Sequence, residues 1–277
     1  MQEGDRLQCW RNVIGCLGLL LIFAAQTGYA REFPVFDALL YQSKPDLTKQ
    51  GLARLKVVYD GELWNKGESH ERPNAHKINL VVSKLNPSVL TCLDIEEWPT
   101  FGTPEEVDSG IARYNAVVAL VREEQPSLKF GYYGIVPHND YWRATKPRED
   151  KGHREWVREN SRLKEIARGV DVIFPSLYPF YPDPKGWEKY AIENLKEART
   201  YGKPVYAFIW PEYHDSNRIY KGQQIPPDFW RLQLETCYKY ADGIVIWGGW
   251  QKRWDENAAW WIETKKFLQR KRDESRN

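Results

Sequence analysis

Short β-branched and aromatic runs alternate with longer amphipathic segments from Pro34 onward in this 277-residue chain. Such alternation is typical of repeated βα units around a parallel sheet. Strand-like runs cover residues 35–40, 55–59, 89–96, 129–135, 170–178, 204–210 and 243–247. Helix-like segments cover residues 104–124, 154–168, 186–201, 227–240 and 256–270. We therefore expect an α/β fold, a single distorted β/α (TIM-like) barrel with about seven parallel strands; an open doubly wound sheet is the alternative.

Aromatic and acidic side chains stand where most of the strand-like runs end. In a β/α-barrel all of these ends meet at one mouth, where active sites are built, whereas an open sheet spreads them along an edge. A mouth rich in aromatic faces and carboxylates suits a carbohydrate, whose ring stacks while its hydroxyls form hydrogen bonds. The residues concerned are Tyr59, Asp60, Asp94, Glu96, Tyr132, Tyr133, Tyr178, Trp210, Glu212 and Trp247. Their positions favour the barrel.

Asp94 and Glu96 follow the apolar run at residues 89–93. Residues i and i+2 of a strand share a face, which places the two Cβ atoms ~6.6 Å apart on one side. Like charges at this range raise the pKa of one partner, and a Glu kept protonated near neutral pH can serve as a general acid. The pair predicts acid/base chemistry; solvated or salt-bridged carboxylates are the alternative.

The same spacing restricts the mechanism, because two neighbours on one strand lie on one side of a bound sugar. Two-acid glycosidases need carboxylates on opposite sides of the bond, ~5–5.5 Å apart for retention and ~6.5–9.5 Å apart for inversion. A substrate whose own acetamido group attacks the anomeric carbon needs a single acid/base residue. This route gives Glu96 the proton and leaves Asp94 to orient the acetamido group.

Four segments, in order, resemble motifs of the hyaluronidase family of glycoside hydrolases. Residues 94–98 resemble its D-x-E-x-W segment, and residues 131–134 its Y-G strand end. Residues 174–179 resemble its L-P-S-x-Y segment, and residues 242–250 its D-G-I-x-x-W-G ending. The resemblance extends from about residue 34 to about residue 250.

The resemblance implies a distorted barrel that hydrolyses β-glycosidic bonds beside N-acetylglucosamine by the substrate-assisted route. It implies a hyaluronan-like polysaccharide or glycosaminoglycan as substrate. It assigns Glu96 as proton donor and Asp94 as the partner that orients the acetamido group. Tyr133 and Tyr178 would form hydrogen bonds around the reaction centre, and Trp247 would pack under the N-acetyl group or the ring.

Several positions depart from the family pattern. Residues 135–141 replace a Pro-Asp-Cys-Tyr-Asn-like stretch. Trp210 and Glu212 stand in a segment that also differs, and we expect both to contact substrate at the mouth, with Glu212 as a possible second carboxylate. Cys92 and Cys237 do not match the disulfide positions of animal members, so they form either one disulfide or two buried thiols.

The N-terminus has the layout of a signal peptide. Two arginines precede an apolar run at residues 13–25, and a small-x-small tripeptide follows at residues 28–30. The run is shorter than the ~20 residues that span a bilayer, and an uncleaved anchor is the alternative. We expect residues 1–30 to be removed and residues 31–277 to form one secreted catalytic domain, extracellular or periplasmic, without membrane contact.

Other functions have little support in the sequence. The formal net charge is +2, so electrostatic capture of nucleic acid is not expected. The five histidines lack metal-ligand spacing, and no phosphate- or dinucleotide-binding motif is present, so we expect neither a metal nor another cofactor. A muramidase-like lysozyme stays an alternative, although residues 37–39 lack its D-x-S pattern, and so does a catalytically inactive glycan-binding barrel.

Overall fold

Extended segments pair in parallel around a ring in residues 32–274, the part of the chain that the computed structural model describes. One sheet has the order β2 (Ala53–Arg54), β1 (Val35–Leu39), β7 (Gly243–Gly248) and β6 (Tyr206–Ile209). The other has the order β3 (Lys56–Tyr59), β4 (Thr91–Asp94) and β5 (Phe130–Tyr132). Leu55 alone separates β2 from β3, so one extended segment connects the two sheets on this side.

The expected strand at residues 170–178 closes the ring on the other side, but it is not a continuous strand. It forms isolated parallel bridges, from Phe174 to Tyr133 after β5 and from Ser176 to Phe208 of β6. Pro175 has no backbone N–H to donate, which interrupts a regular ladder here. We call residues 173–176 the seam. With the seam included, seven segments follow chain order around a distorted β/α-barrel, as expected.

Alternate side chains along the strands point to opposite sides of the barrel wall. One set fills the barrel interior: Phe36, Ala38, Cys92, Val172, Phe174, Tyr178, Phe208, Trp210 and Val245. The other set joins the larger core between the strands and the helices, as Val35, Leu39 and Val58 do. The interior below the mouth is therefore packed with side chains.

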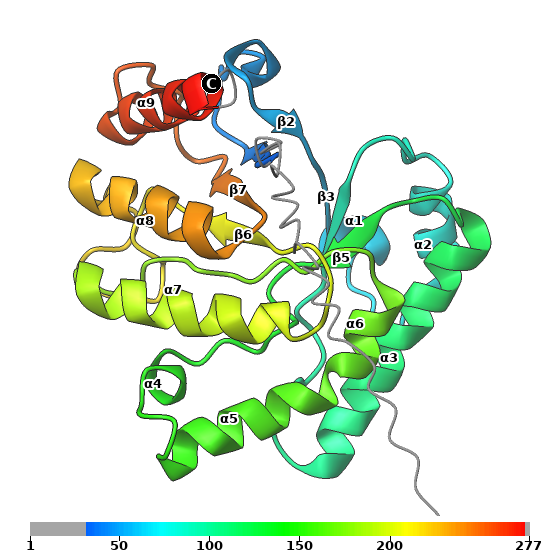
Figure 1. Cartoon of the computed structure of the whole chain (residues 1–277). Helices are drawn as coiled ribbons and strands as arrows, with labels where there is room; N and C mark the ends of the chain where they lie inside the picture. Colours follow the sequence, from blue (N-terminus) through cyan, green and yellow to red (C-terminus); the bar gives the residue numbers. More distant parts are fainter. Residues whose placement is uncertain (1–31, 275–277) are drawn as a thin grey trace, which may run out of the picture. The chain divides into compact units, whose positions relative to one another are not determined.

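The helices lie outside the strands, with α7 and α8 side by side and α3 next to α6 (Figure 1). The helices in chain order are α1 (Asp60–Leu63), α2 (Ala75–Val82), α3 (Pro104–Glu124), α4 (Tyr141–Ala144), α5 (Lys151–Arg162), α6 (Lys164–Gly169), α7 (Pro184–Arg199), α8 (Pro227–Tyr240) and α9 (Ala259–Glu274), with a 3-10 turn at Leu47–Gln50. The bounds of α3 and α8 are those expected. The single helix expected at residues 154–168 is instead α5 and α6.

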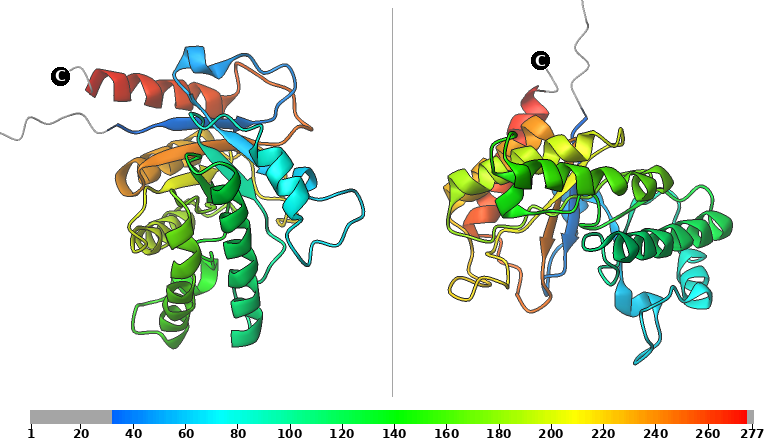
Figure 2. Two further views of the ribbon diagram at one scale, coloured as in Figure 1. Left: turned by 90° about the vertical axis from the view of Figure 1, so that its right-hand side faces the viewer. Right: turned by 90° about the horizontal axis from the view of Figure 1, so that it is seen from below.

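The chain between α1 and α2 projects from the barrel as a loop (Figure 2). The residues of this loop are mostly polar, as expected for a segment that is exposed to solvent. None of the helices in residues 32–274 combines the length and apolar character of a membrane span. The predicted signal peptide lies outside the described residues.

Cys92 in the barrel interior and Cys237 on α8 are both buried free thiols. Of the two alternatives left open by the sequence, two buried thiols is therefore confirmed, and residues 32–274 contain no disulfide.

Candidate active site

Strand β4 delivers the two predicted catalytic carboxylates to the mouth. Asp94 is its last residue, and Glu96 follows two positions later on the same side. The intervening Ile95 is buried in the outer core. The hydroxyl of Tyr114 donates to the carbonyl oxygens of Ile95 (3.1 Å) and Trp98 (3.3 Å), which fixes the backbone on both sides of Glu96. Helix α3 thus fixes the backbone that carries Glu96.

A cavity of about 180 Å³ lies at the carboxyl ends of the strands. It contains six of the seven predicted site residues, and Glu212 is the one that it leaves out. His214 and Asp215, which the sequence did not indicate, also line it. The full lining is Val57, Asp94, Glu96, Tyr133, Tyr178, Phe208, Trp210, His214, Asp215 and Trp247.

Both carboxyl groups of the pair favour the protonated state more than usual. Burial, followed by the charges of Glu96 and Asp60, raises the pKa of Asp94 to about 7. Glu96 stands more exposed at the opening, yet the protein around it, with Asp60 and Glu97, still raises its pKa. From the sequence we expected a raised pKa at one of the two carboxyl groups, whereas in the structure the pKa of both is raised. The Asp94 carboxyl, with its pKa of about 7, can hold a proton near neutral pH, and the raised pKa of Glu96 favours its role as a general acid.

One oxygen of the pair has no partner within the protein. Oδ1 of Asp94 is buried and accepts no hydrogen bond from the described residues. A buried polar atom without a partner is costly unless a ligand or water satisfies it. The atom is therefore suited to accept a hydrogen bond from an N–H or O–H of a bound substrate.

Aromatic side chains form the wall beside the carboxylates. The ring of Tyr178 lies 5.8 Å from Tyr133 and from Trp247, and 5.4 Å from Trp210, between ring centroids. The hydroxyl of Tyr133 is 2.9 Å from Oγ of Ser176 at the seam. Burial raises the pKa of Tyr133 and of Tyr178, so both hydroxyls keep their protons as hydrogen-bond donors.

Glu212 is 3% exposed and lies in a second cavity of about 150 Å³. It accepts a hydrogen bond from the hydroxyl of Tyr41 (3.1 Å) and pairs with Nζ of Lys252 (3.3 Å). The second cavity shares Trp210, Asp215 and Trp247 with the first. The structure therefore places Glu212 behind the aromatic wall and not beside Asp94 and Glu96.

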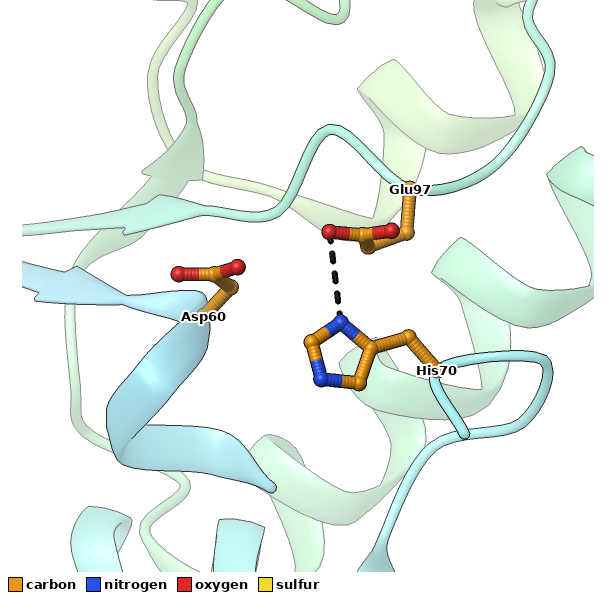
Figure 3. A group of neighbouring side chains, drawn as sticks. All are labelled: Asp60, His70 and Glu97. Atoms are coloured by element: carbon orange, nitrogen blue, oxygen red, sulfur yellow. Dashed lines mark ion pairs between the residues drawn. The ribbon is translucent and has the colours of Figure 1, made fainter. Parts of the chain in front are cut away.

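On the opposite side of the carboxylate pair, a residue of the projecting loop meets the strand ends. Nδ1 of His70 is 3.2 Å from Oε1 of Glu97, with Asp60 beside them (Figure 3). The indole N–H of Trp98 donates to the carbonyl oxygen of His70 (2.7 Å), and the imidazole stacks on Trp64 at 4.5 Å. We call Asp60, His70 and Glu97 the acidic flank.

The acidic flank has the spacing of a metal site, which the sequence did not indicate. Its three possible ligand atoms lie within 4.8 Å of one another. Glu97 is exposed, and His70 already pairs with it, so an ordinary ion pair accounts for the contact. We assign no metal to this group.

No protein-family model matches this sequence. No curated protein matches it either. Among solved structures, bee venom hyaluronidase superposes with a TM-score of 0.62 at 14% identity, over 88% of this chain and 100% of that one. The complex of bee venom hyaluronidase with a hyaluronic acid tetramer superposes with a TM-score of 0.61 at 14% identity, over 89% of this chain and 97% of that one. The endo-beta-1,4-mannanase of Thermotoga petrophila superposes with a TM-score of 0.52 at 13% identity, over 81% of this chain and 59% of that one. Such low identities show the fold alone, and they confirm the β/α-barrel.

Proposed function

We propose that this protein is a glycoside hydrolase that cleaves β-glycosidic bonds beside an N-acetylhexosamine. The observation that carries the proposal is the position of Asp94 and Glu96 together at one side of an aromatic cavity, at the barrel mouth. The structures that superpose on the chain include a hyaluronidase and a mannanase, which supports the broader class of glycan-cleaving enzymes.

In the proposed mechanism Glu96 donates its proton to the glycosidic oxygen as the bond to the anomeric carbon breaks. The carbonyl oxygen of the substrate's acetamido group forms the new bond to that carbon, which gives a cyclic cationic intermediate. Oδ1 of Asp94 accepts a hydrogen bond from the acetamido N–H and compensates the positive charge. Water then attacks the anomeric carbon, and the Glu96 carboxylate takes up its proton, which restores the starting state.

The aromatic wall would position the sugar for this reaction. Tyr133 and Tyr178 stay protonated and can donate hydrogen bonds to substrate oxygens near the reaction centre. Trp247 gives an apolar face for the N-acetyl group or the ring. The indole N–H of Trp210 is buried without an acceptor among the described residues and can donate to a sugar hydroxyl.

A Glu96→Gln variant tests the proposal. The protein and the variant are incubated with hyaluronan, chondroitin, chitin oligomers and peptidoglycan, and reducing ends are counted across pH. We expect the protein to cleave an N-acetylhexosamine glycan and the variant to lose at least ~100-fold in turnover, the usual effect of removing a general acid. Glu124→Gln is the matched control, since it makes the same change on an exposed residue at the last position of α3 and should keep turnover within a few-fold.

Three results would contradict the proposal or change its class. Full activity of Glu96→Gln would remove its proton donor. Cleavage of peptidoglycan alone would favour the muramidase-like alternative. Glycan binding without turnover at any pH would favour a non-catalytic binding barrel, provided that circular dichroism shows the protein to be folded.

A further inference from the structure

The catalytic cavity is acidic and has no basic lining residue. Asp94, Glu96 and Asp215 contribute three carboxyl groups to it, and none of its lining side chains in the described part of the chain is Lys or Arg. His214 also lines it, but burial lowers the pKa of the imidazole, which favours the neutral form. A ligand in this cavity therefore meets negative and neutral groups.

The acidic flank adds negative charge on one side of the cavity. Asp60 and Glu97 both act on Glu96 electrostatically. His70 pairs with Glu97 and, even when protonated, can neutralise only one of the two carboxylates. A carboxylate on a sugar bound on this side would have no unpaired cation to approach within the acidic flank.

The second cavity lies on the other side of the aromatic wall, and its one basic lining side chain is already paired. Nζ of Lys252 lies 3.3 Å from Oε2 of Glu212 and donates to the carbonyl oxygen of Gly222 at 2.5 Å. Asp215 lines this cavity too, so its two acidic lining residues, Glu212 and Asp215, face a single Lys in the described part of the chain. Trp250, 64% exposed, offers an apolar face to a sugar ring there.

We propose that the substrate is an uncharged N-acetylhexosamine polymer of the chitin type, and not a polyanion with uronate sugars. This inference rests on the proposed function. In an alternating glycosaminoglycan, an N-acetylhexosamine inside the chain has a uronate on each side. Both carboxylates would then approach like charges, on the acidic flank and around Asp215, and like charges without compensation disfavour binding. Neutral sugars avoid this repulsion and keep the stacking and hydrogen bonds. This inference departs from the hyaluronan-like substrate that the sequence resemblance implies.

The test compares a polyanionic substrate with its carboxyl-reduced, uncharged form and with a neutral N-acetylhexosamine polymer. The full protein is given hyaluronan oligosaccharides, the same oligosaccharides with their carboxyl groups reduced to primary alcohols, and chitin oligosaccharides of equal length. We expect kcat/KM for the reduced form to exceed that for native hyaluronan by at least ~10-fold at low salt, with a narrower gap at ~0.5 M salt because screening weakens the repulsion. Chitin oligosaccharides should be cleaved at least as well as the reduced form.

A charge variant sharpens the comparison. Asp215→Asn removes the carboxylate that the two cavities share, so it should raise the ratio of native to reduced hyaluronan cleavage several-fold. Glu124→Gln makes the same charge change on an exposed residue at the far end of α3 and should leave this ratio unchanged. Native hyaluronan cleaved as fast as its reduced form would overturn the inference and leave the proposed function intact. No cleavage of any of the three substrates would count against the proposed function itself.

Discussion

The indole N–H of Trp247 on β7 donates a hydrogen bond of 3.3 Å to the hydroxyl of Tyr59 at the end of β3. Strand β1 lies between the two, and its residue in register with Trp247 is Ala38, whose small side chain points into the barrel. The bond thus connects side chains of the two sheets at the mouth and holds one face of the aromatic wall in a defined orientation.

Removal of this acceptor should affect both stability and turnover. We expect Tyr59→Phe to lower the free energy of unfolding by about 0.5–1.5 kcal/mol, as for a typical hydrogen bond, and to reduce kcat/KM because the Trp247 ring loses its anchor. Urea denaturation and turnover assays measure the two effects. Tyr240→Phe, at the C-terminal end of α8, is the matched control, and equal effects of both variants would argue against the anchoring role.

The carboxylate pair should make the protein less stable at high pH. Asp94 has a pKa of about 7 in the folded state against an ordinary value of 3.8, so the folded state binds more protons between these values and stability falls as pH rises through that window. Asn does not titrate. We therefore expect the free energy of unfolding of Asp94→Asn, relative to that of the wild type, to rise by about 2–4 kcal/mol from pH 4 to pH 8.

Thermal or urea unfolding of both proteins across this pH range measures the gain. Asp228→Asn, on the exposed first turn of α8, controls for the substitution itself. A stability difference between wild type and Asp94→Asn that does not change with pH would show that the Asp94 pKa is the same in the folded and unfolded states.

Gly131 in β5 is required by the close approach of Val172, the residue just before the seam. A Cβ atom at this position would lie 2.3 Å from the carbonyl oxygen of Val172. We expect Gly131→Ala to cost about 2–4 kcal/mol, because backbone cannot move aside cheaply. Gly61 in α1 has open space around its Cβ position, so Gly61→Ala should be neutral or stabilising by up to about 1 kcal/mol. Chemical denaturation of both variants distinguishes the two cases, and an equal cost would contradict the packing argument.

A Glu212→Gln variant distinguishes a mechanism with one acid/base residue from a mechanism with two. Because it pairs with Tyr41 and Lys252 behind the aromatic wall, Glu212→Gln should destabilise the fold by about 1–3 kcal/mol while kcat stays within a few-fold of wild type. A loss of ~100-fold in a variant that is still folded would make Glu212 a second acid/base residue.

The barrel mouth could be predicted because its signals are local. Asp94, Tyr133, Tyr178 and Trp247 each stand at or just beyond the end of an apolar run, and parallel topology brings these ends together. The same reasoning predicted Glu212 at the mouth, but in the structure Glu212 does not line the cavity that contains Asp94 and Glu96. The strand ends at Ile209, and the chain then turns back so that Glu212 forms an antiparallel bridge with Gln224, which the i, i+2 rule does not foresee.

The acidic flank could not be predicted, because its geometry depends on long-range contacts. His70 reaches Glu97 because Trp98 holds the loop backbone and Trp64 supports the imidazole, and none of these pairings has a local sequence signature. The prediction of a regular strand over residues 170–178 was wrong for a different reason. The apolar and β-branched residues of this run are typical of a strand, but a proline within it interrupts the hydrogen-bond ladder.

The seam has a thermodynamic consequence for ligand binding. Asp94 and Tyr133 come from the side of β4 and β5, whereas Trp210 and Trp247 come from the side of β6 and β7. The isolated bridges of the seam are what joins these two sides there. A ligand that fills the cavity would contact both sides, so we expect it to oppose their separation and to raise the unfolding temperature by linkage. Slower amide hydrogen exchange at the seam would then report occupancy of the candidate active site, even by a ligand that is never cleaved.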